Sequence, residues 1–126
     1  MRPLTGDART VGAAGEALAA GWLERAGLRI VARNYRCPRG EVDLIADDRG
    51  EIVFVEVRTR RAGALVGPEE SVTRRKQQRL LRAAEHYLQA TAAAERPWRV
   101  DLVAIEVGPG GRVARVEHLR SVTEWD

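Results

Sequence analysis

The sequence predicts an α/β fold, in which a mixed β-sheet is flanked by helices. Three observations support it. The chain has 126 residues, a length that fits one compact domain with a real hydrophobic core. Two segments carry apolar residues at helical spacing, and five shorter segments have the apolar, β-branched character of strands. Their order along the chain is helix, three strands, helix, two strands (α-β-β-β-α-β-β).

We assign residues 10–120 to this single domain. Residues 1–9 are expected to form a flexible N-terminal segment, and residues 121–126 a C-terminal tail. No internal repeat, low-complexity tract or long linker divides the sequence. The chain is therefore expected to fold as one unit.

The first helix is predicted from Thr10 to Ala26, just before Gly27. Its apolar residues recur at spacings of three and four, which is typical of one buried stripe: Val11, Ala14, Leu18, Trp22 and Leu23. A first strand is predicted from Leu28 to Tyr35. The segment Cys37-Pro38-Arg39-Gly40 then has the composition of a turn.

A β-hairpin is predicted next, from the strands Glu41–Asp47 and Glu51–Thr59. If Arg49-Gly50 forms a two-residue turn, Asp48 pairs with Glu51. Counting back along both strands then puts Asp43 opposite Glu56 and Glu41 opposite Arg58. Residues directly opposite in antiparallel strands share a face, with their Cβ atoms about 5 Å apart. The hairpin therefore gathers four charged side chains on one face.

The second helix is expected to follow a loop at Gly63–Pro68. Ser71 or Thr73 can cap its start, and it runs to about Ala93. Its apolar stripe consists of Leu80, Leu81, Ala84, Tyr87 and Leu88. Two more strands, Trp98–Val107 and Arg112–Leu119, are predicted around a Gly-rich turn.

Composition narrows the function classes. Apolar residues make up 44% of the chain and charged residues 31%, which excludes a disordered or fibrous protein. The net charge is +3 and the pI about 9.7, so polyanions are plausible partners. A single cysteine, Cys37, excludes an intramolecular disulfide and a cysteine-only zinc site. No apolar run is long enough to span a membrane, so a cytoplasmic protein is expected.

The acidic pair of the hairpin suggests metal chemistry. Two carboxylates as close as Asp43 and Glu56 raise one pKa by repulsion unless a cation lies between them. Mg²⁺ or Mn²⁺ suits such a site because these hard ions prefer carboxylate, carbonyl and water oxygens. A site of this kind cleaves phosphodiesters, and Arg58 would supply a fixed positive charge. The alternative is an ordinary strand with one solvated face, on which Glu41 and Arg58 form a stabilising cross-strand pair.

Several ordered motifs resemble one known family. They are Gly15-Glu16, Arg33-Asn34-Tyr35-Arg36, Gly40-Glu41-Val42-Asp43-Leu44-Ile45-Ala46, Val53-Phe54-Val55-Glu56-Val57-Arg58-Thr59-Arg60, Lys76 with the stripe to Leu88, and Arg99-Val100-Asp101-Leu102-Val103. In this combination, which covers roughly Val11 to Ile105, the chain resembles the YraN family, whose members are functionally uncharacterised. The resemblance implies a restriction-endonuclease-like (tRNA endonuclease-like) core, similar to archaeal Holliday junction resolvases.

The resemblance also implies roles for individual residues. The related nucleases carry an Asp…Glu-x-Lys signature. Matching it position by position makes Glu16, Asp43 and Glu56 the metal ligands, with the carbonyl of Val57 as a further ligand. Asp43, Glu56 and Arg58 then form the catalytic set, and Arg58 stands where the lysine would be.

Arginine in the lysine position is a departure with chemical consequences. The guanidinium group is planar and permanently protonated, so Arg58 can stabilise charge but cannot act as a base. Lys76, the only lysine among the 21 basic residues, lies near the start of the second helix. It is a candidate to take over part of the missing role. A catalytically decayed site is the alternative.

A phosphate-binding surface is predicted from the remaining basic residues. Its candidates are Arg33, Arg60, Arg61, Arg75, Lys76 and Arg79, of which Arg33 is suggested by the resemblance alone. The alternative for the helical arginines is a solvated helix face. The tryptophans are interpreted as packing residues, and His86 and His118 are too isolated in the sequence to be ligands.

Three functional hypotheses follow. The first is a metal-dependent nuclease-like protein that acts on DNA, in preference to RNA, with branched or junction DNA as a candidate substrate. The second is a catalytically decayed nucleic-acid-binding module, and the third is a structural or partner-binding protein that keeps the fold. The resemblance to dimeric resolvases also leads us to expect a homodimer.

Overall fold

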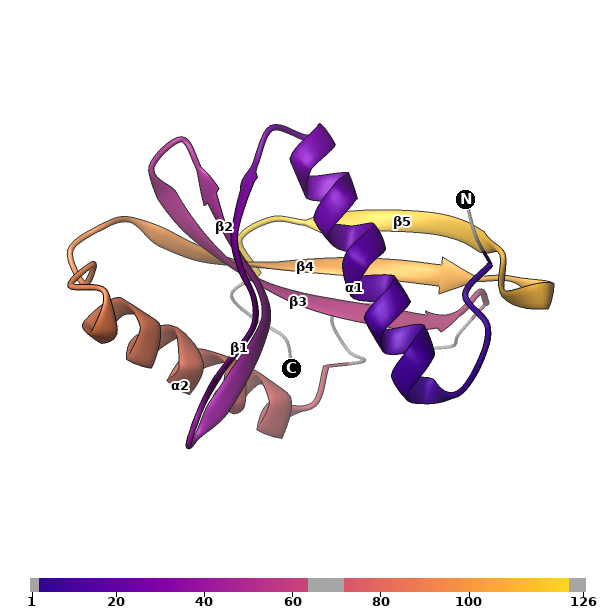
Figure 1. Ribbon diagram of the computed structural model, residues 1–126, viewed down its shortest axis with the longest axis horizontal. Helices are drawn as coiled ribbons and strands as arrows, with labels where there is room; N and C mark the ends of the chain where they lie inside the picture. Colours follow the sequence, from indigo (N-terminus) through magenta and orange to yellow (C-terminus); the bar gives the residue numbers. More distant parts are fainter. Residues whose placement is uncertain (1–2, 64–71, 123–126) are drawn as a thin grey trace.

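The structure is a computed structural model that describes residues 3–63 and 72–122. It contains a five-stranded mixed sheet, with α1 crossing one face and α2 on the opposite side (Figure 1). The predicted element order is confirmed, and the architecture is compatible with a restriction-endonuclease-like core. The elements are α1 (Ala8–Arg25), β1 (Arg29–Cys37), β2 (Gly40–Asp48), β3 (Glu51–Arg61), α2 (Arg74–Ala90), β4 (Trp98–Val107), the short 3₁₀ helix η2 (Pro109–Gly111) and β5 (Val113–Leu119).

The strands lie in the order β1-β2-β3-β4-β5. β3 and β4 are parallel, whereas all other neighbours are antiparallel. A parallel pair needs a crossover connection, and the segment containing α2 provides it. The core is accordingly split in two: α2 packs on the sheet face that carries Ile45 and Phe54, and α1 packs on the face that carries Leu44 and Val55.

The β2–β3 hairpin has the predicted register. Arg49 and Gly50 both have positive φ angles, 53° and 97°, which a two-residue type I′ turn requires. The carboxylate of Asp47 accepts a hydrogen bond from the Gly50 N–H at 2.9 Å and fixes this turn. Pairing runs from Asp48 opposite Glu51 to Leu44 opposite Val55, where it stops.

Two glycines let the helices approach the sheet closely. A Cβ atom on Gly15 of α1 would lie 2.4 Å from Oγ1 of Thr59 on β3. A Cβ atom on Gly40, at the start of β2, would lie 1.9 Å from the backbone oxygen of Arg79 on α2. At Gly40 the overlap is with backbone, so only glycine fits there, whereas at Gly15 the hydroxyl of Thr59 would have to move to make room. Gly40 therefore fixes where α2 meets the strands that carry the acidic residues.

Some details of the helices differ from the prediction. Trp22 and Leu81 were placed in the buried stripes, but they are 38% and 46% exposed. Ala19 and Ala20 are fully buried instead, because α1 lies so close to the sheet that small side chains fill the contact. α2 ends at Ala90, short of Ala93.

The N-terminal segment is partly packed. α1 begins at Ala8, because the side chain of Asp7 accepts a hydrogen bond from the Thr10 N–H at 2.9 Å and caps the helix. Leu4, in the segment expected to be flexible, is buried and donates its N–H to the carbonyl of Gly111. The predicted loop from residue 64 onward and the tail from residue 123 onward lie outside the described residues.

A buried ionic network joins β4 to the hairpin and to the end of β5. Asp101 is fully buried and accepts hydrogen bonds from Arg99, from Nε2 of His118 at 2.8 Å and from the Ser121 N–H at 2.9 Å. Arg99 in turn contacts Glu51 at 2.7 Å. His118 is thus a nearly buried residue with a carboxylate partner. No helix among the described residues is long and apolar enough to cross a membrane.

Candidate active site

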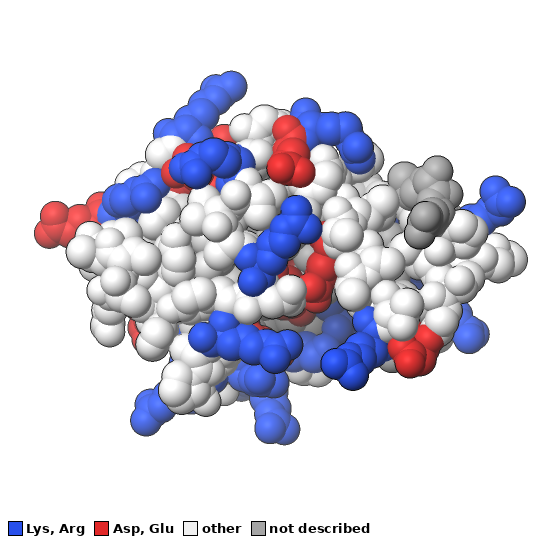
Figure 2. Space-filling model, viewed as in Figure 1, with Lys and Arg blue, Asp and Glu red and all other residues white. Residues whose placement is uncertain are grey.

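A cavity of about 210 Å³ opens where β2 separates from β3, beside the first turns of α2. Figure 2 shows acidic side chains in the middle of one face of the molecule, with Lys and Arg side chains around them. The cavity contains every residue predicted as catalytic and every predicted metal ligand. Its lining residues are Glu16, Glu41, Asp43, Glu56, Val57, Arg58, Lys76 and Arg79.

The end of the β2–β3 ladder creates this space. Asp43 and Glu56 are the first residues beyond the last pair, Leu44 and Val55. Phe54 packs toward α2, and side chains two residues apart on a strand share a face, so Glu56 also points toward α2. The alternation of β2 is interrupted around Asp43, because Val42 and Ile45 both pack on the α2 side whereas Leu44 packs on the α1 side. The two predicted carboxylates nevertheless line one cavity.

The backbone of Val57 completes the junction between the strands. Odd-numbered residues of β3 direct their N–H and C=O groups toward β2, so Val57 would form the next hydrogen bonds of the ladder. Its N–H donates instead to Oδ2 of Asp43 at 2.8 Å. The Asp43 side chain therefore replaces a main-chain partner and is held in place by this bond.

Burial and mutual repulsion disfavour the ionised acidic pair. Burial is the main cause that raises the pKa of Glu56 to about 8, and the neighbouring charge of Asp43 raises it further. Burial also raises the pKa of Asp43, and the hydrogen bond from the Val57 N–H opposes this effect. The metal-free pair therefore retains a proton at neutral pH, as expected for two carboxylates without a cation between them.

Glu16 reaches the cavity from α1. Burial raises its pKa, as does the charge of Asp43, while a hydrogen bond from Asn34 lowers it. All three predicted acids thus lie around one space. Among residues 3–63 and 72–122, however, no three Asp, Glu, His or Cys side chains form a group that could hold a metal ion together.

The donor set fits a hard divalent cation of the Mg²⁺ type. Mg²⁺ is commonly held by one or two carboxylates while it keeps several waters and contacts substrate phosphates. Asp43 and Glu56 supply two carboxylates, and the Val57 carbonyl faces the same gap between the strands. Their raised pKa values also indicate that a cation would relieve an unfavourable local charge.

Two cationic side chains approach the acidic pair from different elements. Arg58 comes from β3, and its Nε atom is buried without a hydrogen-bond partner among the described residues. Lys76 comes from the first turn of α2 and lines the same cavity. An unsatisfied buried donor is energetically costly, so the Arg58 Nε is suited to an anionic ligand that would accept its hydrogen bond.

The predicted cross-strand pair of Glu41 and Arg58 is wrong. β2 and β3 have already separated before this point, so the two residues are not paired across a ladder. Glu41 instead lies 3.6 Å from Arg79 of α2 and 3.5 Å from Arg36 of β1. Glu41 and its two arginine partners thus form the rim of the cavity. Glu41 is not the partner of Arg58, whose side chain lines the cavity together with the acidic pair.

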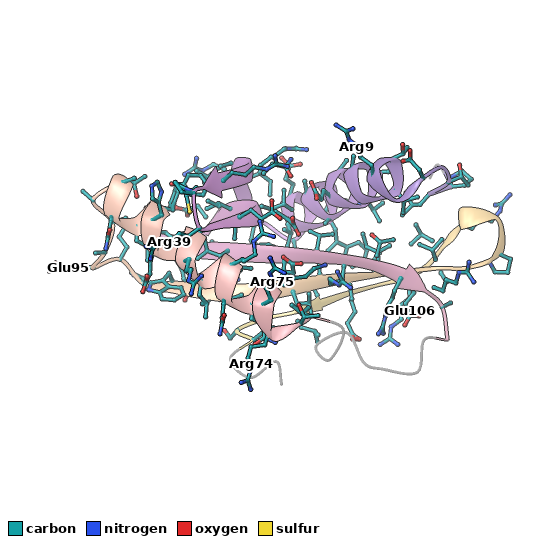
Figure 3. All side chains as sticks on the ribbon, turned by 90° about the horizontal axis from the view of Figure 1, so that it is seen from below. Arg9, Arg39, Arg74, Arg75, Glu95 and Glu106 are labelled. Atoms are coloured by element: carbon teal, nitrogen blue, oxygen red, sulfur yellow. The ribbon has the colours of Figure 1, made fainter. Side chains whose placement is uncertain are left out.

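The predicted phosphate-binding residues are divided among several sites. Lys76 and Arg79 line the cavity, and Arg75 is exposed on the first turn of α2 (Figure 3). Arg33 and Arg61 are exposed on β1 and at the end of β3, outside the cavity lining. Arg60 does not fit the expected exposed surface: its side chain is only 14% exposed and lies 3.3 Å from Glu106.

Sequence reasoning missed the contribution of the β1–β2 turn. Arg36 joins the rim of the cavity through Glu41, and Arg39 lies beside α2, where it lines a neighbouring pocket with Arg82 (Figure 3). No spacing rule connects this turn to a helix that lies far along the chain. The close contact at Gly40, the Tyr35–His86 hydrogen bond and the Glu41–Arg79 ion pair bring them together.

Comparison with known proteins identifies relatives along most of the chain. A model of the family described as uncharacterised protein family UPF0102 matches residues 15–105. A UPF0102 protein of Beutenbergia cavernae is 50% identical over 112 residues, which cover 89% of this chain and 94% of that protein. One of Symbiobacterium thermophilum is 50% identical over 105 residues, covering 83% and 89% of the two chains. The matched region contains every residue that lines the cavity.

Proposed function

This chain belongs to the uncharacterised protein family UPF0102, in agreement with the resemblance to the YraN family, and we propose that it is a metal-dependent nuclease that hydrolyses phosphodiester bonds of DNA. One observation carries the proposal. A single cavity combines the buried acidic pair Asp43 and Glu56 with two cationic side chains, Arg58 and Lys76. Oxygen ligands beside positive charges are what phosphodiester hydrolysis requires.

Each group has a part in the reaction. Hydrolysis forms a bond between a water oxygen and phosphorus and breaks the bond from phosphorus to the leaving sugar oxygen. The water loses a proton and the leaving oxygen gains one, with no change in oxidation state. When bound, Mg²⁺ or Mn²⁺ supplies Lewis-acid activation of the water and the phosphate. Asp43 and Glu56 would hold this ion, and the buried Nε of Arg58 would bind an oxygen of the phosphate.

The charges around the cavity favour a nucleic acid as substrate, and the resemblance to junction resolvases favours DNA over RNA. Basic residues approach the cavity from α2 and from the β1–β2 turn, and such residues contact a phosphate backbone without reading base sequence. The resemblance to resolvases suggests branched or junction DNA as the substrate. It also suggests that the protein acts as a homodimer. The rival is a nucleic-acid-binding module whose chemistry is lost, and arginine at position 58 is the observation that favours it.

The test is a cleavage assay with matched variants. Purified wild type, Asp43→Ala and Glu95→Ala are incubated with linear, flapped and four-way DNA and with structured RNA, in Mg²⁺ or Mn²⁺. Glu95 is exposed and does not line the cavity, so Glu95→Ala controls for the loss of one carboxylate. Binding to the same substrates is measured without metal.

We expect wild type and Glu95→Ala to cut DNA equally, and Asp43→Ala to bind DNA without cutting it. Equal cutting by Asp43→Ala would reveal a contaminating nuclease and refute the proposal. Salt-dependent binding without cutting by any protein would favour the decayed module. No binding at low salt would exclude both and leave a structural or partner-binding role.

A further inference from the structure

We propose that the cavity has a catalytic lysine that comes from the helix rather than from the strand: Lys76 contacts the attacked phosphate and its water, while Arg58 anchors a phosphate oxygen. This inference rests on the proposed nuclease function. It assigns separate tasks to two cationic side chains that line the cavity from different elements, β3 and α2. The strand position then needs no lysine, and arginine at position 58 no longer implies a decayed site.

The position of Lys76 is fixed by the fold. It is the third residue of α2, and its backbone N–H donates to the side chain of the cap residue Thr73 at 3.3 Å. One turn further along, the backbone of Arg79 lies against Gly40, where no larger residue fits. The first two turns of α2 are thus held against the start of β2, which places the Lys76 side chain in the lining of the cavity.

Lys76 shares the cavity with the acidic pair. Asp43 and Glu56 line it from β2 and β3, and Lys76 lines it from the first turn of α2. The other basic residue of α2 in the lining, Arg79, lies 3.6 Å from Glu41 at the rim. Lys76 is therefore the cation of the helix that is placed to act beside the acidic pair.

The two side chains suit different tasks. A lysine ammonium group is a compact charge with three donors that rotate freely, so it can contact both a phosphate oxygen and a nearby water. Arg58 has a rigid planar guanidinium group whose Nε is already buried and lacks a partner among the described residues. A fixed donor of this kind suits a phosphate oxygen whose position changes little during the reaction.

A purely structural role for Lys76 makes different predictions. If Lys76 only neutralised the acids, its loss would change stability and metal affinity but would leave the cleavage rate near that of wild type. Arg74, two residues earlier on α2, provides the matched control. It extends from the start of the helix away from the sheet and does not line the cavity (Figure 3).

The experiment compares wild type, Lys76→Gln and Arg74→Gln in three measurements. These are metal-free DNA affinity by fluorescence anisotropy, Mn²⁺ affinity by calorimetry, and the single-turnover cleavage rate with DNA fully bound. In Lys76→Gln we expect the rate to fall about 100-fold, the cost typical of losing one donor to a transition state. We also expect its Mn²⁺ affinity to rise, because a competing cation is removed. Arg74→Gln should match wild type in rate and Mn²⁺ affinity.

Restoring the charge provides a second check. In a Cys37→Ala background, Lys76→Cys treated with 2-bromoethylamine carries an ammonium group near its original position, and it should recover most of the rate. A rate for Lys76→Gln within about threefold of Arg74→Gln, or no recovery on restoring the ammonium group, would overturn the role of Lys76 and leave the nuclease function intact. Wild type that binds Mn²⁺ but cuts nothing would instead overturn the nuclease function, and the role of Lys76 with it.

Discussion

Replacing Glu56 by Gln is expected to stabilise the metal-free protein as the pH rises. Glutamine has nearly the same shape and keeps hydrogen-bonding groups beside Asp43, but it never ionises. In wild type, the ionised form of Glu56 is disfavoured by burial and by Asp43, which together raise its pKa to about 8 from an ordinary value of 4.5. The substitution therefore removes a cost that the fold bears only when Glu56 is charged.

The sign and the size follow from the two pKa values. A carboxyl group whose pKa is higher in the folded state contributes stability fully below the unfolded pKa, and this contribution is lost as the pH rises through the folded pKa. For Glu56 the loss begins near pH 4.5 and is complete above about pH 8. At about 1.4 kcal/mol per pH unit, it amounts to roughly 3 kcal/mol at pH 7 and roughly 5 kcal/mol above pH 8.

The assay is thermal unfolding with EDTA at several pH values between 5 and 9. For a chain of this size, about 3 kcal/mol corresponds to a rise in Tm of roughly 10 °C at pH 7. Glu95→Gln, which changes an exposed residue, should follow wild type at every pH. Millimolar Mn²⁺ should reduce the Tm difference between Glu56→Gln and wild type, because the ion stabilises only wild type, which keeps the Glu56 carboxylate. A difference between Glu56→Gln and wild type that stayed constant with pH would refute the reasoning.

Three further predictions concern the framework and the assembly. Gly40→Ala should destabilise the protein by at least about 3 kcal/mol, because its Cβ would overlap the backbone of Arg79. Gly12→Ala, which has open space around its Cβ, should be neutral or stabilising by about 1 kcal/mol. Urea unfolding measures both changes. Asp101→Ala should cost about 1–3 kcal/mol, because the hydrogen bonds from His118 and the Ser121 N–H are lost while Arg99 keeps Glu51 and Asp48, and unchanged stability in chemical denaturation would contradict this. Light scattering should show a homodimer, and a monomer at high concentration would remove junction resolution from the proposal.

The hairpin could be predicted from the sequence in detail. A two-residue turn leaves one register, and that register determines which side chains share a face. Arg49 and Gly50 adopt the required positive φ angles, and the pairs from Asp48–Glu51 to Leu44–Val55 follow as expected. The turn chemistry therefore predicts the register up to the position just before Asp43 and Glu56.

The end of the ladder could not be predicted. Nothing in the sequence of β2 or β3 shows that pairing stops after Leu44 and Val55, because the separation depends on the side chain of Asp43 taking the N–H of Val57. The expected pair of Glu41 and Arg58 failed for this reason. Its failure also reveals the cavity, since an unbroken ladder would have closed it.

The placement of Lys76 depends on tertiary packing. A helical pattern predicts which face of α2 is apolar, but it does not fix how closely the helix approaches the sheet. For α2, Gly40 determines that distance, and its role is visible only once its neighbours are known. The close approach of α1 also explains why Trp22, assigned to the buried stripe, is partly exposed while Ala19 and Ala20 fill the contact.

The central claim is that Asp43 and Glu56 hold a divalent cation, and a crystal soaked in millimolar Mn²⁺ tests it most directly. The pH should be above 8, where the proton held by the pair is released. Anomalous scattering should then show one strong peak about 2.1 Å from a carboxylate oxygen of each residue, with the Val57 carbonyl among the neighbouring ligands. No peak between the two carboxylates, or Mn²⁺ bound only elsewhere on the surface, would contradict the account.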